Sequence, residues 1–429
     1  MLCPHLTIGG ANLRAAIAAL VAAIIASCAA PAGAREEAPQ IAASAAILVD
    51  AETGQVLYEK NADERRPIAS TTKIMTALLV LEHGKLNQTC AVSKRAAETA
   101  QSSIGLEAGE NLPLEDLLTA MLVKSANDAA AAAAEAVAGS QPAFAEMMNA
   151  KAQELGAVNT HFVNPHGLYE GQHYSTARDL AIITRQAMRI PRFCELVRTR
   201  QATIPWPSKG GERVLVNKNK LLTMMPGADG VKTGFVKESG PCLVASASRG
   251  GWRLLAVLLN SPDLWSEAQA LLDYGFDNFR ALRFAQRGKP VAWVQVRGGE
   301  RSRVSLVPAE SLMLVLPRWS QPERAYMPRL DLTRTRLQAP VQGGQKMGRM
   351  VLVAGDRELS AVELLAGETV PRSLLSSLWL GMTRFTLGLA ALAMVVRSYY
   401  VATKKHRTRR VYVRVTPEQR EPRFDVPLR

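Results

Sequence analysis

The sequence predicts a mixed α/β (α+β) domain, a small all-β domain after it and an apolar helix near the C-terminus. Helix-like and strand-like segments are interspersed over residues 41–280, which we take as the first domain. Short strand-like runs with Gly and Pro turns fill residues 283–371, the second domain. Residues 373–396 are the longest apolar stretch of the 429-residue chain, and a basic tail over 397–429 ends it.

Composition places the chain among globular proteins. It is 48% hydrophobic and long enough to bury a sizeable core. The net charge is +14, and much of the excess lies late, in KKHRTRR at 404–410 and beyond. We find no aromatic-basic stripe or nucleic-acid motif, so we interpret this charge as membrane-related and expect no nucleic-acid partner.

The N-terminus predicts export from the cytoplasm. Arg14 precedes the apolar run AAIAALVAAIIAS, which is too short to span a bilayer. Small residues follow, with an A-x-A-like site at Ala32–Ala34, so residues 1–34 are typical of a secretory signal peptide. The stretch IASC allows an alternative, a lipoprotein signal with lipidation at Cys28. Both alternatives place the first domain outside the cytoplasm.

The first domain begins with a strand–turn–strand pattern, AAILVDAETGQVLYEK, in which ETG is the turn. An apolar helix follows from about residue 73. Residues 114–137 predict two helical segments joined near KSAN. The remaining predicted elements are helices over 142–156 and 176–190, three strands over 228–260 and a closing helix over 264–279.

The apolar stretch 373–396 predicts a membrane anchor. Only Arg384 interrupts it, at a cost of ~2.5–3.5 kcal/mol in the middle of a bilayer. The basic run KKHRTRR after it favours a spanning helix with a cytoplasmic tail. A basic helix lying in the membrane interface is the alternative that the same charges allow.

A serine three residues before a lysine suggests nucleophilic chemistry. In PIASTTKIMT, Ser70 and Lys73 share one face of the expected helix. A serine hydroxyl needs an adjacent base, and burial lowers the pKa of a lysine amine because desolvation disfavours its charged form. S-x-x-K alone is common, and by itself the pair is better explained by a helix-capping serine and a solvated lysine.

Two further elements favour the catalytic interpretation. Residues 124–128 read KSAND, and residues 230–235 read GVKTGF. The combination of S-x-x-K, an S-x-N element and K-T-G, in this order, is the signature of penicillin-binding proteins and class A β-lactamases. The sequence thus nominates seven residues: Ser70, Lys73, Ser125, Asn127, Lys232, Thr233 and Gly234.

Each nominated side chain suits one chemical task. Ser125 can relay a proton between Lys73 and a nucleophile or leaving amine, and the amide of Asn127 can hold both substrate backbone and lysine. Lys232 and Thr233 suit a substrate with a free terminal carboxylate. Gly234 leaves room for substrate backbone along a strand edge, and the backbone N–H groups of Ser70 and Phe235 would form an oxyanion hole.

Beyond these motifs, the chain resembles the low-molecular-mass penicillin-binding proteins, the serine-type D-alanyl-D-alanine carboxypeptidases of family S11. The blocks that resemble the family include AAILVDAETGQVLYEKNADERRPIASTTKIMTALLVLE, NTHFVNPHGLYEGQHYSTARDLA and LQAPVQGGQKMGRMVLV. The resemblance covers roughly residues 43–372. It implies a penicillin-binding, serine β-lactamase-like fold, with an antiparallel sheet flanked by helices.

The resemblance also implies a reaction. Ser70 would attack the penultimate D-Ala carbonyl of a peptidoglycan stem pentapeptide, terminal D-Ala would leave, and water would hydrolyse the acyl-enzyme. β-Lactam antibiotics would block Ser70. Lys218 and Arg253 match basic family positions near the cleft, and Phe235 stands where relatives carry histidine. No metal or cofactor is implied, and His161, His166 and His173 lack an acidic ligand pattern beside them.

Three alternatives remain open. A class A β-lactamase needs a deacylating glutamate before the KTG strand, for which Glu170 is the nearby candidate. A D,D-endopeptidase would use the same catalytic residues, although such relatives usually lack the β-domain. A non-catalytic cell-wall scaffold would have no need of the complete set of seven motif residues.

Overall fold

The computed structural model describes residues 38–100, 102–320 and 325–405. The predicted signal peptide, Cys28 and the tail from residue 406 onward lie outside these ranges. The chain divides into two compact units, of which the first holds the residues up to Phe284 together with Ser311–Met327. The second holds Ala285–Glu310 and the chain from Pro328 onward. The domain limits expected from the sequence stay predictions.

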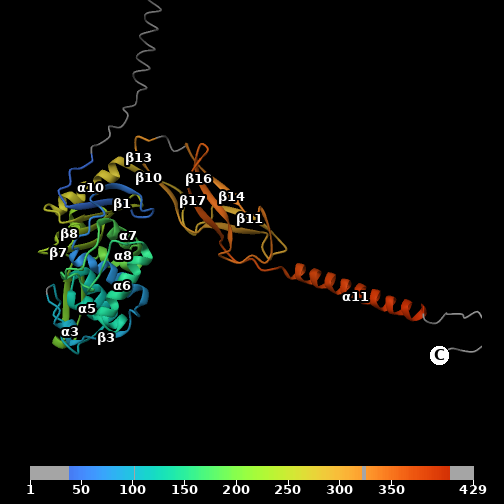
Figure 1. Ribbon diagram of the computed structural model, residues 1–429, viewed down its shortest axis with the longest axis horizontal. Helices are drawn as coiled ribbons and strands as arrows, with labels where there is room; N and C mark the ends of the chain where they lie inside the picture. Colours follow the sequence, from blue (N-terminus) through green and yellow to red (C-terminus); the bar gives the residue numbers. More distant parts are fainter. Residues whose placement is uncertain (1–37, 101, 321–324, 406–429) are drawn as a thin grey trace, which may run out of the picture. The chain divides into compact units, whose positions relative to one another are not determined.

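The first unit is built on a five-stranded antiparallel sheet (Figure 1). Its strands, in spatial order, are β2 (Val56–Lys60), β1 (Ala45–Asp50), β9 (Trp252–Leu259), β8 (Gly240–Arg249) and β7 (Ala228–Val236). The KTG segment therefore lies on an edge strand, β7, whose outer side has no strand partner within this sheet. An edge strand can accept an extended peptide as a further strand.

Both faces of this sheet are buried, which explains the unbroken apolar run AAILV in β1. Ala45, Ile47 and Val49 of β1 point into one hydrophobic cluster, whereas Ala46 and Leu48 point into another. Successive side chains of a strand alternate between faces, so a strand covered on both sides needs apolar residues at every position.

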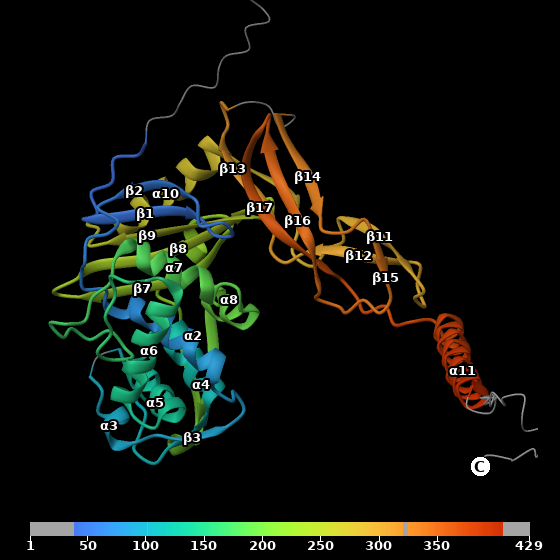
Figure 2. The same ribbon diagram turned by 45° about the vertical axis from the view of Figure 1, so that its right-hand side comes forward.

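Helices cover the two faces unequally (Figure 2). Helix α10 (Leu264–Asn278) packs on one face, against β8 and β9. Helices α7 (Ala177–Ala187) and α8 (Pro191–Arg198) pack on the other face, with the remaining helices beyond them. These are α2 (Lys73–His83), α3 (Lys94–Ala97), α4 (Leu114–Thr119), α5 (Asn127–Ala138) and α6 (Gln141–Leu155). A short helix, α9 (Leu221–Met224), precedes β7.

The helices and strands predicted for the first unit are present, and the structure adds elements that we did not predict. One is a hairpin of β5 (Gln201–Trp206) and β6 (Gly211–Val216), and a smaller one pairs β3 (Thr89–Ala91) with β4 (Asn111–Pro113). The run LMLVLP, expected in the β-domain, forms β13 (Leu312–Pro317). It pairs with β10 (Phe279–Ala285) and is grouped with the first unit.

The second unit contains a six-stranded sheet in the order β14-β16-β17-β12-β11-β15. The β11–β12, β12–β17 and β16–β17 pairs are antiparallel, whereas β11 and β15 are parallel. The strands are β11 (Ala292–Arg297), β12 (Arg303–Pro308), β14 (Tyr326–Leu332), β15 (Arg336–Gln338), β16 (Lys346–Ala354) and β17 (Arg357–Ala366). This sheet agrees with the all-β character expected after residue 283.

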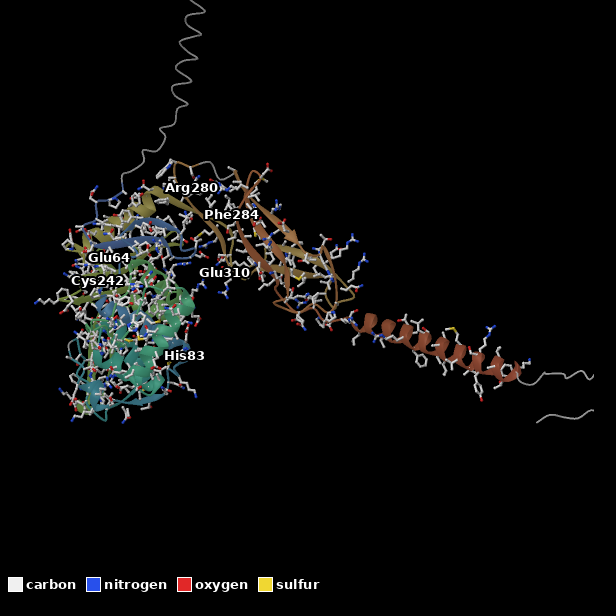
Figure 3. The ribbon with its side chains drawn as sticks, in the orientation of Figure 1. Glu64, His83, Cys242, Arg280, Phe284 and Glu310 are labelled. Carbon is white, nitrogen blue, oxygen red and sulfur yellow. The ribbon has the colours of Figure 1, made fainter. Side chains whose placement is uncertain are left out.

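A long helix, α11 (Leu374–Lys405), ends the described chain. Its segment Gly381–Lys404, 24 residues long with a mean hydropathy of 1.5, is apolar and long enough to cross a membrane. None of this segment is buried against the rest of the protein. The described cysteines are free thiols, and Figure 3 marks one of them, Cys242, which is buried on β8.

Candidate active site

The site begins where a short 3₁₀ turn, Ala69–Thr72, runs into helix α2. This geometry turns Ser70 and Lys73 to the same side, and the Lys73 Nζ lies 3.0 Å from the Ser70 Oγ. Ser70 is partly exposed at the surface of a cleft, whereas Lys73 is fully buried beneath it. The serine is thus accessible to a substrate while its neighbouring amine is shielded from water.

Neutral oxygen atoms surround the Lys73 amine. Besides the Ser70 hydroxyl, it donates to the Asn127 Oδ1 at 2.6 Å and to the backbone carbonyl of His166 at 2.6 Å. Burial holds the pKa of Lys73 well below its usual 10.5; the positive charges of Lys232 and Lys218 lower it further, and Asp128 opposes them. A neutral amine beside a hydroxyl can accept its proton.

Ser125 enters the site from the junction between two helices. A π-helical turn, Ala120–Lys124, follows α4 and ends at Ser125, whose φ of +67° is left-handed. The chain then reverses into α5 at Asn127. In this conformation Ser125 and Asn127 both face the cleft, and the Asn127 Nδ2 donates to the Ala100 carbonyl at 2.9 Å. The junction near KSAN that the sequence predicted therefore presents both polar side chains.

Strand β7 supplies the opposite wall. The Lys232 Nζ donates to the Ser125 Oγ and to the Thr233 carbonyl, each at 2.9 Å. Burial, reinforced by the charge of Lys218, lowers the pKa of Lys232 to about 7. Lys232 and Ser125 thereby connect the strand to the helical side of the cleft.

Gly234 allows β7 to approach the nucleophile closely. A Cβ at this position would lie 3.0 Å from the Ile68 carbonyl oxygen and 3.1 Å from the Ser70 nitrogen, closer than most side chains tolerate. The missing side chain thus lets the strand edge pass beside the turn that carries Ser70. Phe235 follows and is 70% exposed.

These residues line one cleft of about 400 Å³. Lys218 also lies in it and donates to the Ser102 hydroxyl at 2.9 Å. The full lining is Ser70, Ser102, Ser125, Asn127, Gly167, Leu168, Lys218, Thr233, Gly234, Phe235, Val236, Pro241, Leu264 and Trp265. Nine of the ten residues nominated from the sequence therefore line this cleft or bond directly to its lining.

Arg253 is the tenth, and it lies elsewhere. It sits on β9 and forms an ion pair with Asp229 at 2.8 Å, near the beginning of β7. Ser246 and Ser248 also donate to this carboxylate, at 2.6 and 2.9 Å. Arg253 is not among the described residues that line the cleft.

Comparison with known proteins places the chain in a family. Residues 32–263 match the model of the peptidase S11 family, D-alanyl-D-alanine carboxypeptidase. The chain belongs to this family. It is a serine-type carboxypeptidase, as the sequence resemblance predicted. Residues 279–372 match the model of the penicillin-binding protein 5 C-terminal domain.

Individual relatives agree with this assignment. The chain is 34% identical to the D-alanyl-D-alanine carboxypeptidase DacF of Bacillus subtilis, over 77% of this chain and 86% of the relative. It is 31% identical to DacA of Escherichia coli, over 78% and 85%. The crystal structure of penicillin-binding protein 5 from Haemophilus influenzae matches with a TM-score of 0.62 and 29% identity, over 79% of this chain and all of that one. The predicted fold class is confirmed.

One histidine of this carboxypeptidase supports the turn that carries Ser70. His173 lies 2.8 Å from the Thr72 hydroxyl through Nε2, and its Nδ1 accepts the Val163 N–H at 3.1 Å. Burial lowers the pKa of His173 to about 4 and that of His166 to about 3, so both rings are neutral at pH 7. No group of three or more potential metal ligands occurs within the described ranges.

A buried ion pair, which the sequence analysis missed, fixes the loop beside the cleft. Arg213 of β6 makes two bonds to Glu110, at 2.6 and 2.8 Å, and also donates to the carbonyls of Ile104 and Gly105. This loop carries Ser102, the partner of Lys218. The sequence carries no clear signal for this pair, because GERVLV does not alternate polar with apolar residues, and in the fold Arg213 is buried while Val214 is exposed.

Proposed function

We propose that this carboxypeptidase removes the terminal D-Ala from peptidoglycan stem pentapeptides through an acyl-enzyme on Ser70. The observation that carries the assignment is the 3.0 Å contact between the Ser70 hydroxyl and a buried Lys73 amine that has no carboxylate among its hydrogen-bond partners. Such an amine favours its neutral form, which is the form a general base requires.

Acylation begins with transfer of the Ser70 proton to Lys73. The serine oxygen attacks the carbonyl carbon of the penultimate D-Ala, and the carbonyl oxygen becomes an oxyanion. The backbone N–H groups of Ser70 and Phe235 stabilise that charge, which the close approach of Gly234 to the Ser70 nitrogen supports. Two backbone donors suit an oxyanion hole because they need no side-chain rearrangement.

Collapse of the intermediate releases the terminal residue. The bond between the carbonyl carbon and the leaving nitrogen breaks, and Ser125 relays a proton from the lysines to that nitrogen, so D-Ala departs as an amine. The 2.9 Å hydrogen bond from the Lys232 Nζ to the Ser125 Oγ supports Ser125 as this proton relay. Water then attacks the ester, its proton returns through Lys73, and the shortened peptide leaves with Ser70 restored.

Lys232 and Thr233 bind the substrate's terminal carboxylate, and Lys218 adds positive charge from the same side of the cleft. Asn127 holds substrate backbone opposite the β7 edge. We assign Arg253 no contact with substrate in this scheme because it already pairs with Asp229. The expectation that Arg253 holds the carboxylate stays a prediction.

A β-lactamase function is disfavoured by the position of Glu170. This exposed side chain accepts a hydrogen bond from the Asn164 Nδ2 at 2.9 Å and does not line the cleft around Ser70 in the described structure. A deacylating glutamate would have to activate water beside the ester. We therefore expect a penicillin adduct to persist instead of being hydrolysed rapidly.

The test is to incubate the purified protein with a labelled penicillin and to map the adduct by mass spectrometry. We expect one modified residue, Ser70, and release of D-alanine from a pentapeptide substrate. Ser70→Ala should abolish both signals, while Ser93→Ala, at a half-buried helix cap outside the cleft, should retain them. Absence of an adduct on the folded protein would contradict the proposal and favour a scaffold.

We also propose that α11 anchors the enzyme in the cytoplasmic membrane, with the catalytic unit on the extracytoplasmic face. The exposed apolar segment Gly381–Lys404 supports a spanning helix, and the basic residues after it favour a cytoplasmic tail. The full chain should resist extraction by alkaline carbonate, and a chain truncated before Leu374 should be soluble. Release of the full chain by carbonate would instead indicate an interfacial helix.

A further inference from the structure

The cleft has two chemically different halves, arranged in order along β7. Thr233, with Lys232 buried behind it, lies on the N-terminal side of Gly234. Phe235 and Val236 lie on the C-terminal side, where the lining becomes apolar. The side chains of the polar half have roles in the proposed mechanism, whereas in the apolar half only the backbone N–H of Phe235 has been assigned a role and no side chain has.

The apolar half is a continuous surface from three segments, which we call the apolar wall. It consists of Phe235 and Val236 of β7, Pro241 of β8, and Leu264 and Trp265 at the beginning of α10. Phe235 and Pro241 are paired residues across the β7–β8 ladder. Phe235 is largely exposed and lies next to the other apolar lining residues, so together they form an apolar patch whose burial by a ligand would remove apolar area from water.

The direction of a bound peptide decides what meets this wall. If the substrate adds to the β7 edge with its carboxylate at Lys232 and Thr233, its reacting carbonyl lies near Gly234 and Phe235. The chain N-terminal to that carbonyl then continues past Val236, at about 3.3 Å per residue. The residue that precedes the two terminal alanines therefore reaches the wall.

Charge determines which side chain fits there. Among the described lining residues, the only charged side chain is that of Lys218, and no carboxylate lines the cleft. Lys73 and Lys232 lie buried behind it. Lys237, Glu238 and Asp263 flank the wall but are exposed to solvent, where water screens their charges. A free ammonium group on the substrate would thus lack a buried partner near the wall.

We propose that the apolar wall is a specificity subsite that binds the uncharged aliphatic side chain of the residue preceding the two terminal alanines. This inference rests on the proposed function, because it assumes a substrate bound along β7 and cleaved at Ser70. It names the preferred substrate class as peptides whose third residue from the C-terminus carries no free cationic amine.

The experiment compares three acetylated tripeptides, Xaa-D-Ala-D-Ala, in which Xaa is norleucine, Nε-acetyl-lysine or lysine. Release of D-alanine gives kcat/KM for each. We expect the two uncharged peptides to exceed the lysine peptide by about tenfold, within the range that apolar pockets achieve. Equal values for all three peptides would overturn the proposal.

Variants of the apolar wall, measured with the same peptides, provide a second test. In Phe235→Ala, kcat/KM for the norleucine peptide should exceed that for the lysine peptide by less than about threefold. The removed ring contacts only the uncharged norleucine side chain, so its loss should slow that peptide alone. Trp265→Ala should act in the same direction. Phe235 is 70% exposed, so this variant tests recognition without a large loss of stability. An unchanged ratio in both variants would overturn the proposal.

The matched control is Val214→Ala, which removes another exposed apolar side chain, on β6 and outside the cleft. It should leave all three kcat/KM values unchanged. Acylation of wild-type Ser70 by labelled penicillin is measured in parallel. An adduct without discrimination among peptides refutes the subsite alone, whereas no adduct and no D-alanine release refutes the proposed function and the subsite with it.

Discussion

Two buried cationic regions of the catalytic unit differ in their partners. Arg213, of which 3% of the side chain is exposed, forms a bidentate ion pair with a carboxylate, Glu110. Lys73 and Lys232 are equally buried, yet their hydrogen bonds go to hydroxyl, amide and carbonyl oxygens. The carboxylate of Glu110 stabilises the charged form of Arg213, whereas burial without a carboxylate partner destabilises the charged forms of the two lysines.

The pKa directions follow from this difference. Burial raises the pKa of Glu110, but the hydrogen bonds from Arg213 outweigh it and leave the pKa lowered. At Lys73 burial acts without a paired anion, and at Lys232 it does the same, so both amines lose their protons more easily. A buried cation with a carboxylate is structural here, whereas one without a carboxylate is available for proton transfer.

The largest expected effect comes from removing the unpaired amine. Lys73→Met should lower the acylation rate of Ser70 by about 10³-fold or more, because the serine loses its base. The unfolding midpoint should stay the same or rise, since a buried, uncompensated amine is replaced by an apolar chain. Penicillin labelling and thermal unfolding check the two halves. A rapidly acylated Lys73→Met variant would contradict the role of this lysine.

The paired cation should show the opposite pattern. Glu110→Gln leaves Arg213 buried without its anion and should cost about 3–5 kcal/mol in the free energy of unfolding. Urea denaturation measures this cost. The double variant Glu110→Gln, Arg213→Met should recover much of it because the stranded charge is gone. Full stability of the single variant would show that the pair is not a structural element.

The pH profile of kcat/KM sharpens the comparison at the unpaired cations. Because the pKa of Lys232 is about 7, binding of the substrate carboxylate should weaken as pH rises through that value. On the acidic side, activity should fall as Lys73 becomes protonated. Because the pKa of Lys73 lies well below the usual lysine value, this fall should occur at a lower pH than an ordinary lysine would give. Lys232→Arg retains a charge at all these pH values and should move the alkaline limb upward. If the alkaline limb stays in place in Lys232→Arg, that limb reports the titration of a group other than Lys232.

The smallest expected effect concerns Arg253. Since it already pairs with Asp229, Arg253→Ala should change kcat/KM by less than about threefold, compared with about tenfold for Lys218→Ala, which removes a charge from the cleft. Steady-state kinetics with one pentapeptide decides between them. A larger loss for Arg253 than for Lys218 would restore the family-based expectation that Arg253 holds the carboxylate.

The sequence allowed the residues that gather at the cleft to be predicted because each motif is local. S-x-x-K is a property of one helix turn, and the junction at KSAN appears as a break between two helix-forming runs. The alternation of strands around KTG likewise predicted β7, β8 and β9. Local periodicity suffices where neighbours in sequence are also neighbours in space.

The missed features depend on residues far apart in the chain. The pair of Glu110 and Arg213 joins positions 103 residues apart, and neither residue type predicts its partner. The strand LMLVLP was assigned to the β-domain by proximity in sequence, yet it pairs with β10. The two halves of the cleft were also invisible, because Trp265 and Phe235 meet only in the folded unit.

The backbone contacts of His166 and Gly167 should constrain the amino acids at these two adjacent positions differently. Lys73 is held by the carbonyl oxygen of His166, an atom that every amino acid possesses, so natural variants can change this side chain and keep the bond. Gly167 has no such freedom, since a Cβ there would lie 1.9 Å from the Ala69 carbonyl oxygen. We therefore expect the residue at position 166 to vary among relatives and the glycine at position 167 to be conserved. Position 167 should be the more conserved of the two, although it is position 166 that bonds directly to Lys73.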